Sequence, residues 1–411
     1  MVADVVLMRP GRPAEWPDAG LDVAALRDGG WRPVPFRQFL LKVHSRCNLA
    51  CDYCYVYEMA DQSWRSRPLT MSRQVVARTA RRIHEHVVAH SLDEVRIIFH
   101  GGEPLLAGRD FFASAVQTLR GGIAENCAVE FGMQTNGVLL DEDVLEVLLR
   151  HRIRVGVSLD GGPLANDRHR RYASGKGSYE RVVAGLRLLQ QERYAPLFTG
   201  LLCTIDLAND PVATYEELLA FHPPSVDFLL PHGNWSAPPP RRTEDPEQTP
   251  YADWLIPIFD RWYAAPRRET GVRFFEEIIN LVLGGRSHVE SIGLTAVNLI
   301  VVEADGTLEQ VDSLKAAFDG APATGLSVLA DTFDAALEYP SVVARQIGAD
   351  ALCATCRQCP IGNICGGGLY PHRYRSGTGF LNPSVYCADL LALIGHVRER
   401  VQADIEKLGR R

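Results

Sequence analysis

Apolar and polar positions follow two different periods between residues 36 and 235. Short apolar runs rich in β-branched residues occur at 37–43, 94–99, 128–134, 153–159, 197–205 and 226–230. Helical spacing of apolar residues occurs between them, at about 72–90, 110–121, 141–151, 178–192 and 212–220. Strands without strict alternation, separated by helices, indicate parallel strands buried on both faces. The pattern predicts an α/β fold, either a partial (β/α)6 barrel or, alternatively, a doubly wound sheet.

The pattern changes on both sides of this unit. Prolines crowd residues 222–250 and indicate a linker, which two helical segments follow at about 250–265 and 274–283. Two apolar runs around Asp305-Gly306 then predict a β-hairpin. The expected division is an irregular N-terminal extension (1–35), the barrel (36–235), a proline-rich linker with bridging helices (236–297) and a small Cys-rich domain containing the hairpin (298–411).

Composition and charge narrow the classes of function. The chain has 411 residues and a formal net charge of −7, which argues against general affinity for nucleic acid. It contains no apolar run of the roughly 18 residues that a membrane helix needs, and its start lacks the pattern of a secretory signal. We therefore expect a cytoplasmic protein. Because the cytosol keeps thiols reduced, metal binding is the favoured explanation of the clustered cysteines.

Three cysteines lie close together directly after the first predicted strand. Cys47, Cys51 and Cys54 follow the spacing C-x3-C-x2-C within "CNLACDYCY". A structural zinc site completed by His44 is one interpretation. The position of the cysteines favours a catalytic metal site instead, because the active sites of barrel enzymes lie at the carboxyl ends of their strands. Thiolates are soft ligands suited to iron–sulfur clusters, and three of them on a four-iron cluster leave one iron open.

The ends of the next three strands carry small or hydrogen-bonding residues. They read "HGGEP" (100–104), "QTNG" (134–137) and "SLDG" (158–161). Each motif alone is typical of a turn. Their occurrence after consecutive strands, at the same rim as the cysteines, is harder to attribute to turns alone.

Together these motifs resemble the radical S-adenosylmethionine (SAM) superfamily over about residues 36–235. In that family the three cysteines hold a [4Fe–4S] cluster, whose free iron chelates the amino and carboxylate groups of SAM. The resemblance places Tyr53 beside the adenine and Ser158 and Asp160 near the ribose. Related maturases carry H-D-x-x-R, whose arginine meets the SAM carboxylate, and this chain has Asn166 in place of the histidine. The expected cofactor-binding residues are Tyr53, Gly101, Gly102, Glu103 (for the methionyl amine), Asn136, Ser158, Asp160 and Arg170.

A second group of cysteines lies near the end of the chain, in "CATCRQCPIGNICGGG" and "NPSVYC". By itself this group is also typical of a zinc ribbon. After a radical SAM domain it resembles a SPASM region, which binds auxiliary iron–sulfur clusters. The resemblance implies one auxiliary [4Fe–4S] cluster, with Cys356, Cys359, Cys365 and Cys387 as its ligands.

The chain departs from the full SPASM pattern of seven cysteines. Val311 and Leu369 stand where two further ligands would occur, so we expect no second auxiliary cluster. Cys353 is either an alternative ligand or a nearby thiol. Cys127 and Cys203, in or beside predicted strands, are interpreted as small buried hydrophobic residues.

Nearly the whole chain resembles FxsB-type maturases of ribosomally made peptides. The resemblance rests on "CDYCYVYEMADQSWRSRP", "VVEADGTLEQVDSLK" and "CGGGLYPHRY…GFLNPSVYC". It implies a precursor peptide as partner and an electron donor such as flavodoxin or ferredoxin. From the charge and the apolar runs we expect no nucleic acid or membrane partner. The expected reaction is Cβ–H abstraction, attack of the Cβ radical on an aromatic ring to form a cyclophane, and loss of one electron and one proton. The candidate proton acceptors are Asp206, Asp210, His232, Glu303 and Asp312.

Three alternatives remain open from the sequence. An anaerobic sulfatase maturase would oxidise cysteine or serine to formylglycine, although its two expected auxiliary clusters are not supplied here. A thioether-forming peptide maturase would satisfy the same count of ligands. A zinc-stabilised peptide-binding protein would explain both cysteine groups but not Glu103 and the glycines at the strand ends.

Overall fold

The computed structural model describes residues 15–242, 245 and 247–409. Its centre is a set of six consecutive parallel strands, each paired with the next along the chain. They are β1 (Gln38–His44), β2 (Glu94–Gly101), β3 (Ala128–Thr135), β4 (Ile153–Ser158), β5 (Phe198–Thr204) and β6 (Ser225–Leu229). This arrangement confirms the predicted parallel α/β fold and excludes the doubly wound order.

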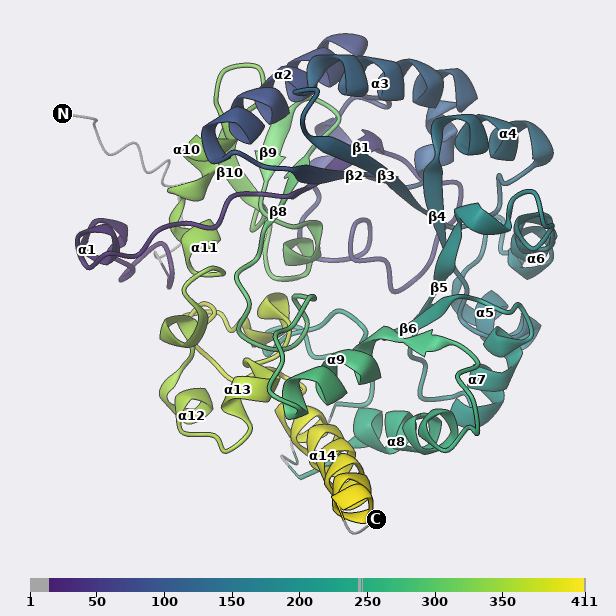
Figure 1. Cartoon of the computed structure of the whole chain (residues 1–411), viewed down its shortest axis with the longest axis vertical. Helices are drawn as coiled ribbons and strands as arrows, with labels where there is room; N and C mark the ends of the chain where they lie inside the picture. The colour runs from purple at the N-terminus through teal and green to yellow at the C-terminus, as the bar shows by residue number, and fades with distance from the viewer. Residues whose placement is uncertain (1–14, 243–244, 246, 410–411) are drawn as a thin grey trace.

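Helices connect the strands and cover the outer side of the sheet. Figure 1 shows them around an open ring of strands. They are α2 (Arg73–His90), α3 (Arg109–Gly122), α4 (Glu142–His151), α5 (Pro163–His169), α6 (Tyr179–Leu189) and α7 (Pro211–Leu219). Local chemistry sets where they begin, since Ser72 accepts a hydrogen bond from Val75 N and Asp141 accepts one from Val144 N. The core lies between strands and helices, where Phe39, Ile97 and Val155 are fully buried.

The sheet extends beyond the six predicted strands at both ends. At one end β7 (Gly271–Val272) pairs with β6; at the other β8 (Leu299–Val302) pairs in parallel with β1, and β9 (Thr307–Glu309) and β10 (Ala323–Ser327) continue antiparallel. The predicted hairpin exists as β8 and β9, and it completes the barrel sheet. The physical reason is that the apolar run of β8 is buried on both faces and covers the open edge of β1.

The remaining elements pack against this sheet or against one another. The helices are α1 (Val23–Asp28), α8 (Pro250–Tyr263), α9 (Arg273–Val282), α10 (Phe333–Leu337), α11 (Pro340–Val343), α12 (Ala354–Arg357), α13 (Gly362–Cys365) and α14 (Cys387–Gly409). Short 3-10 turns are η1 (Ser63–Ser66), η2 (Pro104–Ala107), η3 (Ala195–Leu197), η4 (Asp312–Ala316), η5 (Gly348–Ala351) and η6 (Tyr370–Arg373). The long helix α14 packs on α8 and α9. In the described part of the chain, no helix has both the length and the apolar character needed to cross a membrane.

Two stretches expected to be irregular contain ordered structure. The N-terminal extension includes α1, where Asp22 accepts a hydrogen bond from Ala25 N; residues 1–14 of that extension lie outside the described residues. The proline-rich stretch is held against the C-terminal segment, because Trp235 Nε1 donates to the carbonyl of Pro383 at 2.7 Å and Asn234 is fully buried. Residues 243, 244 and 246 of that stretch are also outside the description.

Candidate functional site

Cys47, Cys51 and Cys54 lie on the loop that leaves the carboxyl end of β1. Burial raises the pKa of the Cys47 thiol to about 12 and that of Cys51 to about 11, and it raises the pKa of Cys54 as well. Ionised Cys51 and Cys54 would each raise the pKa of Cys47, and ionised Cys54 would raise that of Cys51. The thiols therefore keep their protons until a metal with affinity for sulfur binds and displaces those protons.

The spacing of the sulfurs distinguishes an iron–sulfur cluster from a single zinc ion. Four sulfurs around one zinc, at about 2.3 Å each, lie about 3.8 Å apart. Neither group of cysteines, all of which are described, brings three of its sulfurs within 4.8 Å of one another. The sulfurs are therefore more widely separated than one zinc ion requires. A larger metal cluster fits this arrangement better.

Glu103 occupies a closed position at the end of β2. Its carboxylate accepts hydrogen bonds from Thr135 Oγ1 at 2.7 Å, Asn136 N at 2.8 Å and Leu105 N at 3.0 Å. It is fully buried, burial raises its pKa, and among the described residues it forms no ion pair. A buried carboxylate without a cationic partner is a natural site for an ammonium group.

The glycines before Glu103 let the backbone approach the cysteine loop. A Cβ on Gly102 would lie 1.8 Å from Tyr57 Oη, and one on Gly101 would lie 2.4 Å from the carbonyl oxygen of His44. A larger residue at Gly102 would displace Arg46 and Tyr57, and one at Gly101 would displace the backbone of His44. On the next strand end, Asn136 Nδ2 points at the same loop, 3.6 Å from Cys47 Sγ.

Three further predicted residues are joined directly to one another. Tyr53 donates its hydroxyl hydrogen to Asp160, and Arg170 Nη1 donates to the Tyr53 hydroxyl at 2.8 Å. Ser158, two residues before Asp160, accepts a hydrogen bond from Gln134 Nε2 at 3.0 Å. Arg170 is buried, and its Nε–H has no hydrogen-bond partner in the described structure. That unused donor is available to an acceptor such as a carboxylate.

Asn166, the departure from the family motif, supports this group from behind. It is fully buried, and its Nδ2 donates to Ser178 Oγ at 3.1 Å and to Asp167 Oδ1 at 3.0 Å. Ser178 Oγ in turn donates to the backbone carbonyl of Arg170 at 2.6 Å. The asparagine thus holds the segment that carries Arg170. Apart from the changed motif, nothing in the sequence indicates this role.

The second cysteine group comes from three helices and the residues beside them. Cys353 precedes α12, Cys356 lies on α12, Cys359 follows it, Cys365 ends α13 and Cys387 begins α14. Burial, followed by the neighbouring Cys353 thiol, raises the pKa of Cys356 to about 12. Cys387 interacts with both Cys359 and Cys353. The structure therefore brings Cys353 together with the four predicted ligands.

A buried arginine closes the turn beside this group. Arg373 donates to the carbonyl oxygens of Gly366, Gly367 and Gly368 at 2.6 to 3.0 Å. Gly366 has φ +60°, and a Cβ there would meet the Gly293 carbonyl oxygen at 1.8 Å. Arg373 also interacts with the thiols of Cys365 and Cys356. The guanidinium thus places positive charge where deprotonated cysteines would gather.

The positions where two more cysteine ligands would stand are apolar. Val311 belongs to a small buried cluster with Leu314, Tyr370, Tyr374 and Phe380. Leu369 is the residue directly before that cluster's Tyr370. The remaining cysteines are buried, with Cys127 at 6% exposure and Cys203 at 1%. The expectation of a single auxiliary cluster stays a prediction.

Three of the five candidate proton acceptors have other structural partners. Asp206 binds Arg168 and accepts from Ala208 N at 2.9 Å, and these contacts outweigh burial and lower its pKa. Asp210 caps α7 by accepting from Ala213 N. Glu303 lies 3.2 Å from the buried ammonium of Lys315, which overcomes burial and lowers the pKa of Glu303.

The other two candidates face each other across Tyr55, beside the first cysteine loop. Asp312 accepts hydrogen bonds from Lys42 Nζ and from the Tyr55 hydroxyl, both at 2.9 Å. Burial raises the pKa of Asp312, but Lys42 and His100 lower it well below the usual range. The His232 ring lies 4.6 Å from the Tyr55 ring, and burial lowers its pKa to about 4. The sequence analysis did not identify Lys42, Tyr55 and His100 as neighbours of Asp312. The lysine inside the apolar strand β1 was the one sign that a buried charge needed a partner.

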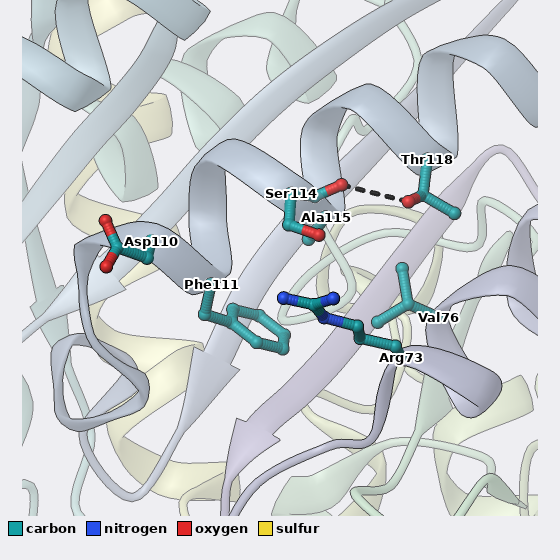
Figure 2. A pocket seen from close by; sticks show the side chains of 7 residues that line it. All are labelled: Arg73, Val76, Asp110, Phe111, Ser114, Ala115 and Thr118. Atoms are coloured by element: carbon teal, nitrogen blue, oxygen red, sulfur yellow. Dashed lines mark hydrogen bonds between the residues drawn. The ribbon is translucent and has the colours of Figure 1, made fainter.

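A separate hollow of about 240 Å³ lies between α2 and α3 on the outer side of the barrel. Figure 2 shows its lining, with Arg73 and Phe111 facing each other below Ser114 and Thr118. Thr118 Oγ1 donates to the Ser114 carbonyl at 2.9 Å. None of the predicted site residues lines this hollow.

Comparison with known proteins agrees with this geometry. Residues 41–218 match the family described as the Radical SAM superfamily. A serine-type anaerobic sulfatase-maturating enzyme of Klebsiella aerogenes is 24% identical over 377 residues, covering 88% of this chain and 86% of the relative. A cysteine-type enzyme of Clostridium novyi is 24% identical over 279 residues, covering 65% of this chain and 71% of the relative.

Solved structures share the fold. Native anSMEcpe with bound AdoMet aligns with a TM-score of 0.74 at 20% identity, covering 90% of this chain and 99% of that one. Streptococcus suis SuiB bound to its precursor peptide SuiA aligns with a TM-score of 0.55 at 12% identity, covering 89% and 78%. Residues 41–218 thus match the radical SAM superfamily, the strand order and the three-thiol loop agree with that match, and the chain is an enzyme that binds a [4Fe–4S] cluster and SAM.

Proposed function

We propose that Cys47, Cys51 and Cys54 are the ligands of the radical SAM cluster. The support is that three thiols converge on one loop at the carboxyl edge of the sheet, spaced more widely than one zinc ion requires. The loop supplies no fourth cysteine. One iron of a four-iron cluster held here would keep an open coordination position.

The groups around this loop suit the polar ends of SAM. Glu103 would bind the amino group, and the free Nε–H of Arg170 would bind the carboxylate. Tyr53, Ser158 and Asp160 would contact the adenosyl part, and Gly101, Gly102 and Asn136 would allow and orient its approach. When bound, the cluster and SAM supply a 5′-deoxyadenosyl radical that removes a hydrogen atom from the substrate.

The C-terminal cysteines would hold one auxiliary [4Fe–4S] cluster. Cys356, Cys359, Cys365 and Cys387 are the proposed ligands, and Cys353 lies close enough to replace one of them. This cluster supplies an acceptor for one electron. Arg373 would stabilise the negative charge of the thiolates that hold it.

The proposed substrate is a ribosomally made precursor peptide, and the proposed product is a cyclophane. The observation that carries this proposal is that the three segments resembling cyclophane-forming maturases meet in space. Arg67 of the first segment binds Glu309 of the hairpin at 3.1 Å. Val311 of the hairpin packs in one cluster with Tyr370 and Tyr374 of the third segment. The three segments therefore form one region of this structure.

Closure of the ring requires that the crosslinked radical lose one electron and one proton. His232 and Asp312 are the proposed proton acceptors, because both contact Tyr55 directly after the first cysteine loop. The pKa of His232 keeps its imidazole neutral near pH 7, and its Nδ1 has no hydrogen-bond partner among the described residues. Asp312 would be the weaker base because Lys42 and His100 lower its pKa well below the usual range.

An anaerobic sulfatase maturase is the second candidate, because the serine-type sulfatase-maturating enzyme of Klebsiella aerogenes aligns with 88% of this chain. Incubation with dithionite, SAM and the short peptide encoded beside the gene separates the reactions. A cyclophane lacks two hydrogen atoms and contains no aldehyde. Formylglycine reacts with a hydrazide probe, and a thioether protects one cysteine from alkylation. An aldehyde product would overturn the cyclophane proposal.

The role of His232 has its own test. We expect His232→Gln to form 5′-deoxyadenosine at the normal rate and crosslinked peptide at least about tenfold more slowly. His222→Gln is the matched control, since His222 lies on the turn after α7. Unchanged crosslinking in His232→Gln would remove this residue from the mechanism. The proposed electron donor is a flavodoxin or ferredoxin, and the proposed setting is the cytoplasm.

A further inference from the structure

A cluster of possible metal ligands lies outside the barrel, where α10 packs on α2 (Figure 1). His86 and His90 are one helical turn apart on α2, so their side chains share a face. Both point at Asp334 in the first turn of α10. His86 Nδ1 lies 2.5 Å from Asp334 Oδ1, and His90 Nε2 lies 2.9 Å from the same oxygen. In the described residues, these are the only three ligand atoms of histidine, cysteine or carboxylate groups found within 4.8 Å of one another.

The cluster has a closed inner side and an open outer side. The His86 side chain is 1% exposed, and its ring packs against those of Phe36, Phe39 and Phe333 at 5.8 to 6.2 Å. His90 is 26% exposed and Asp334 is 44% exposed. A metal ion could therefore enter from solvent and keep a water ligand there. The rigid inner ring would fix its position.

Hydrogen bonds alone leave this cluster incomplete. If His86 and His90 both donate a hydrogen bond to Asp334 Oδ1, then His86 must carry its proton on Nδ1. Its other ring nitrogen, Nε2, then has a lone pair that can only accept a hydrogen bond. Nε2 of His86 is buried without a hydrogen-bond partner in the described structure. The cluster as a hydrogen-bonded triad thus contains an unsatisfied buried acceptor.

A cation between the three side chains removes that defect. Both imidazoles would then direct lone pairs at the metal, and His86 would carry its proton on Nε2. The backbone of Phe36 acts to raise the pKa of His86, as a nearby acceptor does. Metal-bound histidines commonly donate their other N–H to such a backbone group. The half-exposed Asp334 side chain can rotate outward to reach the roughly 3.4 Å that separates ligands around zinc.

We propose that His86, His90 and Asp334 form a binding site for a divalent ion of the zinc class, separate from both cysteine groups. Two imidazoles and one carboxylate suit zinc, with water in the fourth position. The ion would fasten α10 to α2. The ring centres of Phe333 on α10 and Phe39 on β1 lie 4.8 Å apart. The ion would therefore also fix the C-terminal half of the chain against the first strand. The site would be structural.

Zinc titration of the reconstituted holoenzyme tests the proposal. The full chain is washed with chelator, its iron and sulfide are counted to confirm filled cysteine groups, and ZnCl2 is added in a calorimeter. We expect one saturable zinc site per chain. His90→Ala and Asp334→Asn should each weaken it by about tenfold or more. His84→Ala is the matched control, because His84 lies on the exposed face of the same helix.

Two further measurements identify the ligands. Zinc should raise the melting temperature of wild type and leave that of the His90→Ala/Asp334→Asn double variant unchanged. X-ray absorption at the zinc edge should show nitrogen and oxygen neighbours without sulfur. Sulfur scattering, the same titration in wild type and double variant, or no saturable binding in wild type would each overturn the proposal. The two partly exposed positions are varied so that the core stays intact.

Discussion

The two cysteine groups differ in what surrounds their sulfurs. The N-terminal group has three thiols on one loop, next to a buried carboxylate without an ion pair in the described residues and a guanidinium with a free Nε–H. The C-terminal group has five thiols drawn from several helices, next to Arg373, which donates to three carbonyl oxygens. The first site has unused binding capacity for a ligand, whereas the second supplies more than enough sulfur for a complete cluster. The difference suits a catalytic centre and an electron-transfer centre.

The largest expected effect comes from emptying the first group. In Cys47→Ala/Cys51→Ala/Cys54→Ala, we expect iron to fall from about eight to about four per chain, since the second group is separate. Reductive cleavage of SAM to 5′-deoxyadenosine should be abolished. Anaerobic reconstitution with iron and sulfide analysis and chromatography of the products gives both numbers. Retained SAM cleavage would contradict the division of roles.

The next effect tests the unused binding capacity at the first group. We expect Glu103→Gln to weaken SAM binding about 10- to 100-fold, because a charge-assisted contact worth about 1.5–3 kcal/mol is lost. Calorimetry on reconstituted protein measures the affinity, and near-UV circular dichroism checks the fold. Glu94→Gln, at the exposed amino end of the same strand, is the control. Equal affinities in a folded Glu103→Gln protein would refute the proposed ammonium site.

The third prediction compares two variants and shows which four of the five C-terminal thiols hold the auxiliary cluster. We expect Cys387→Ser to lower iron from about eight towards about four and to stop formation of the peptide product, while SAM cleavage continues. Cys353→Ser should keep its iron, because the other four cysteines remain. Iron analysis and product chromatography compare the two. A reversed result would exchange the roles of Cys353 and Cys387.

The smallest expected effect concerns two buried histidines, His100 and His232. Burial lowers the pKa of His100 and His232 to about 4, so the unfolded chain binds more protons than the folded one between pH 6.5 and 4. Stability should therefore fall as pH drops through this window, by about 2 kcal/mol per histidine at pH 5. Melting temperatures of wild type and His100→Gln/His232→Gln between pH 8 and 5 measure the slope. Equal slopes would mean that other groups control acid sensitivity.

The local chemistry of the first site could be recognised from the sequence because its parts occupy equivalent places in a repeated unit. Each strand is followed by its motif, and parallel strands bring these motifs to one rim, as Glu103, Asn136 and Asp160 illustrate. The second site was recognisable as a group, but the place of Cys353 was open. Which of five neighbouring thiols converge depends on how α12, α13 and α14 pack.

By itself, the sequence determined the parallel barrel, the three-thiol loop and the motifs at the strand ends, because periodicity and spacing act over short distances. Tertiary structure decided what depends on segments far apart in the chain. It added β8 to the edge of β1, placed Asp312 against Lys42 and Tyr55, and brought Asp334 to His86 and His90. The physical reason is that the burial of charged and apolar groups selects their partners, and burial exists only once the whole chain has packed.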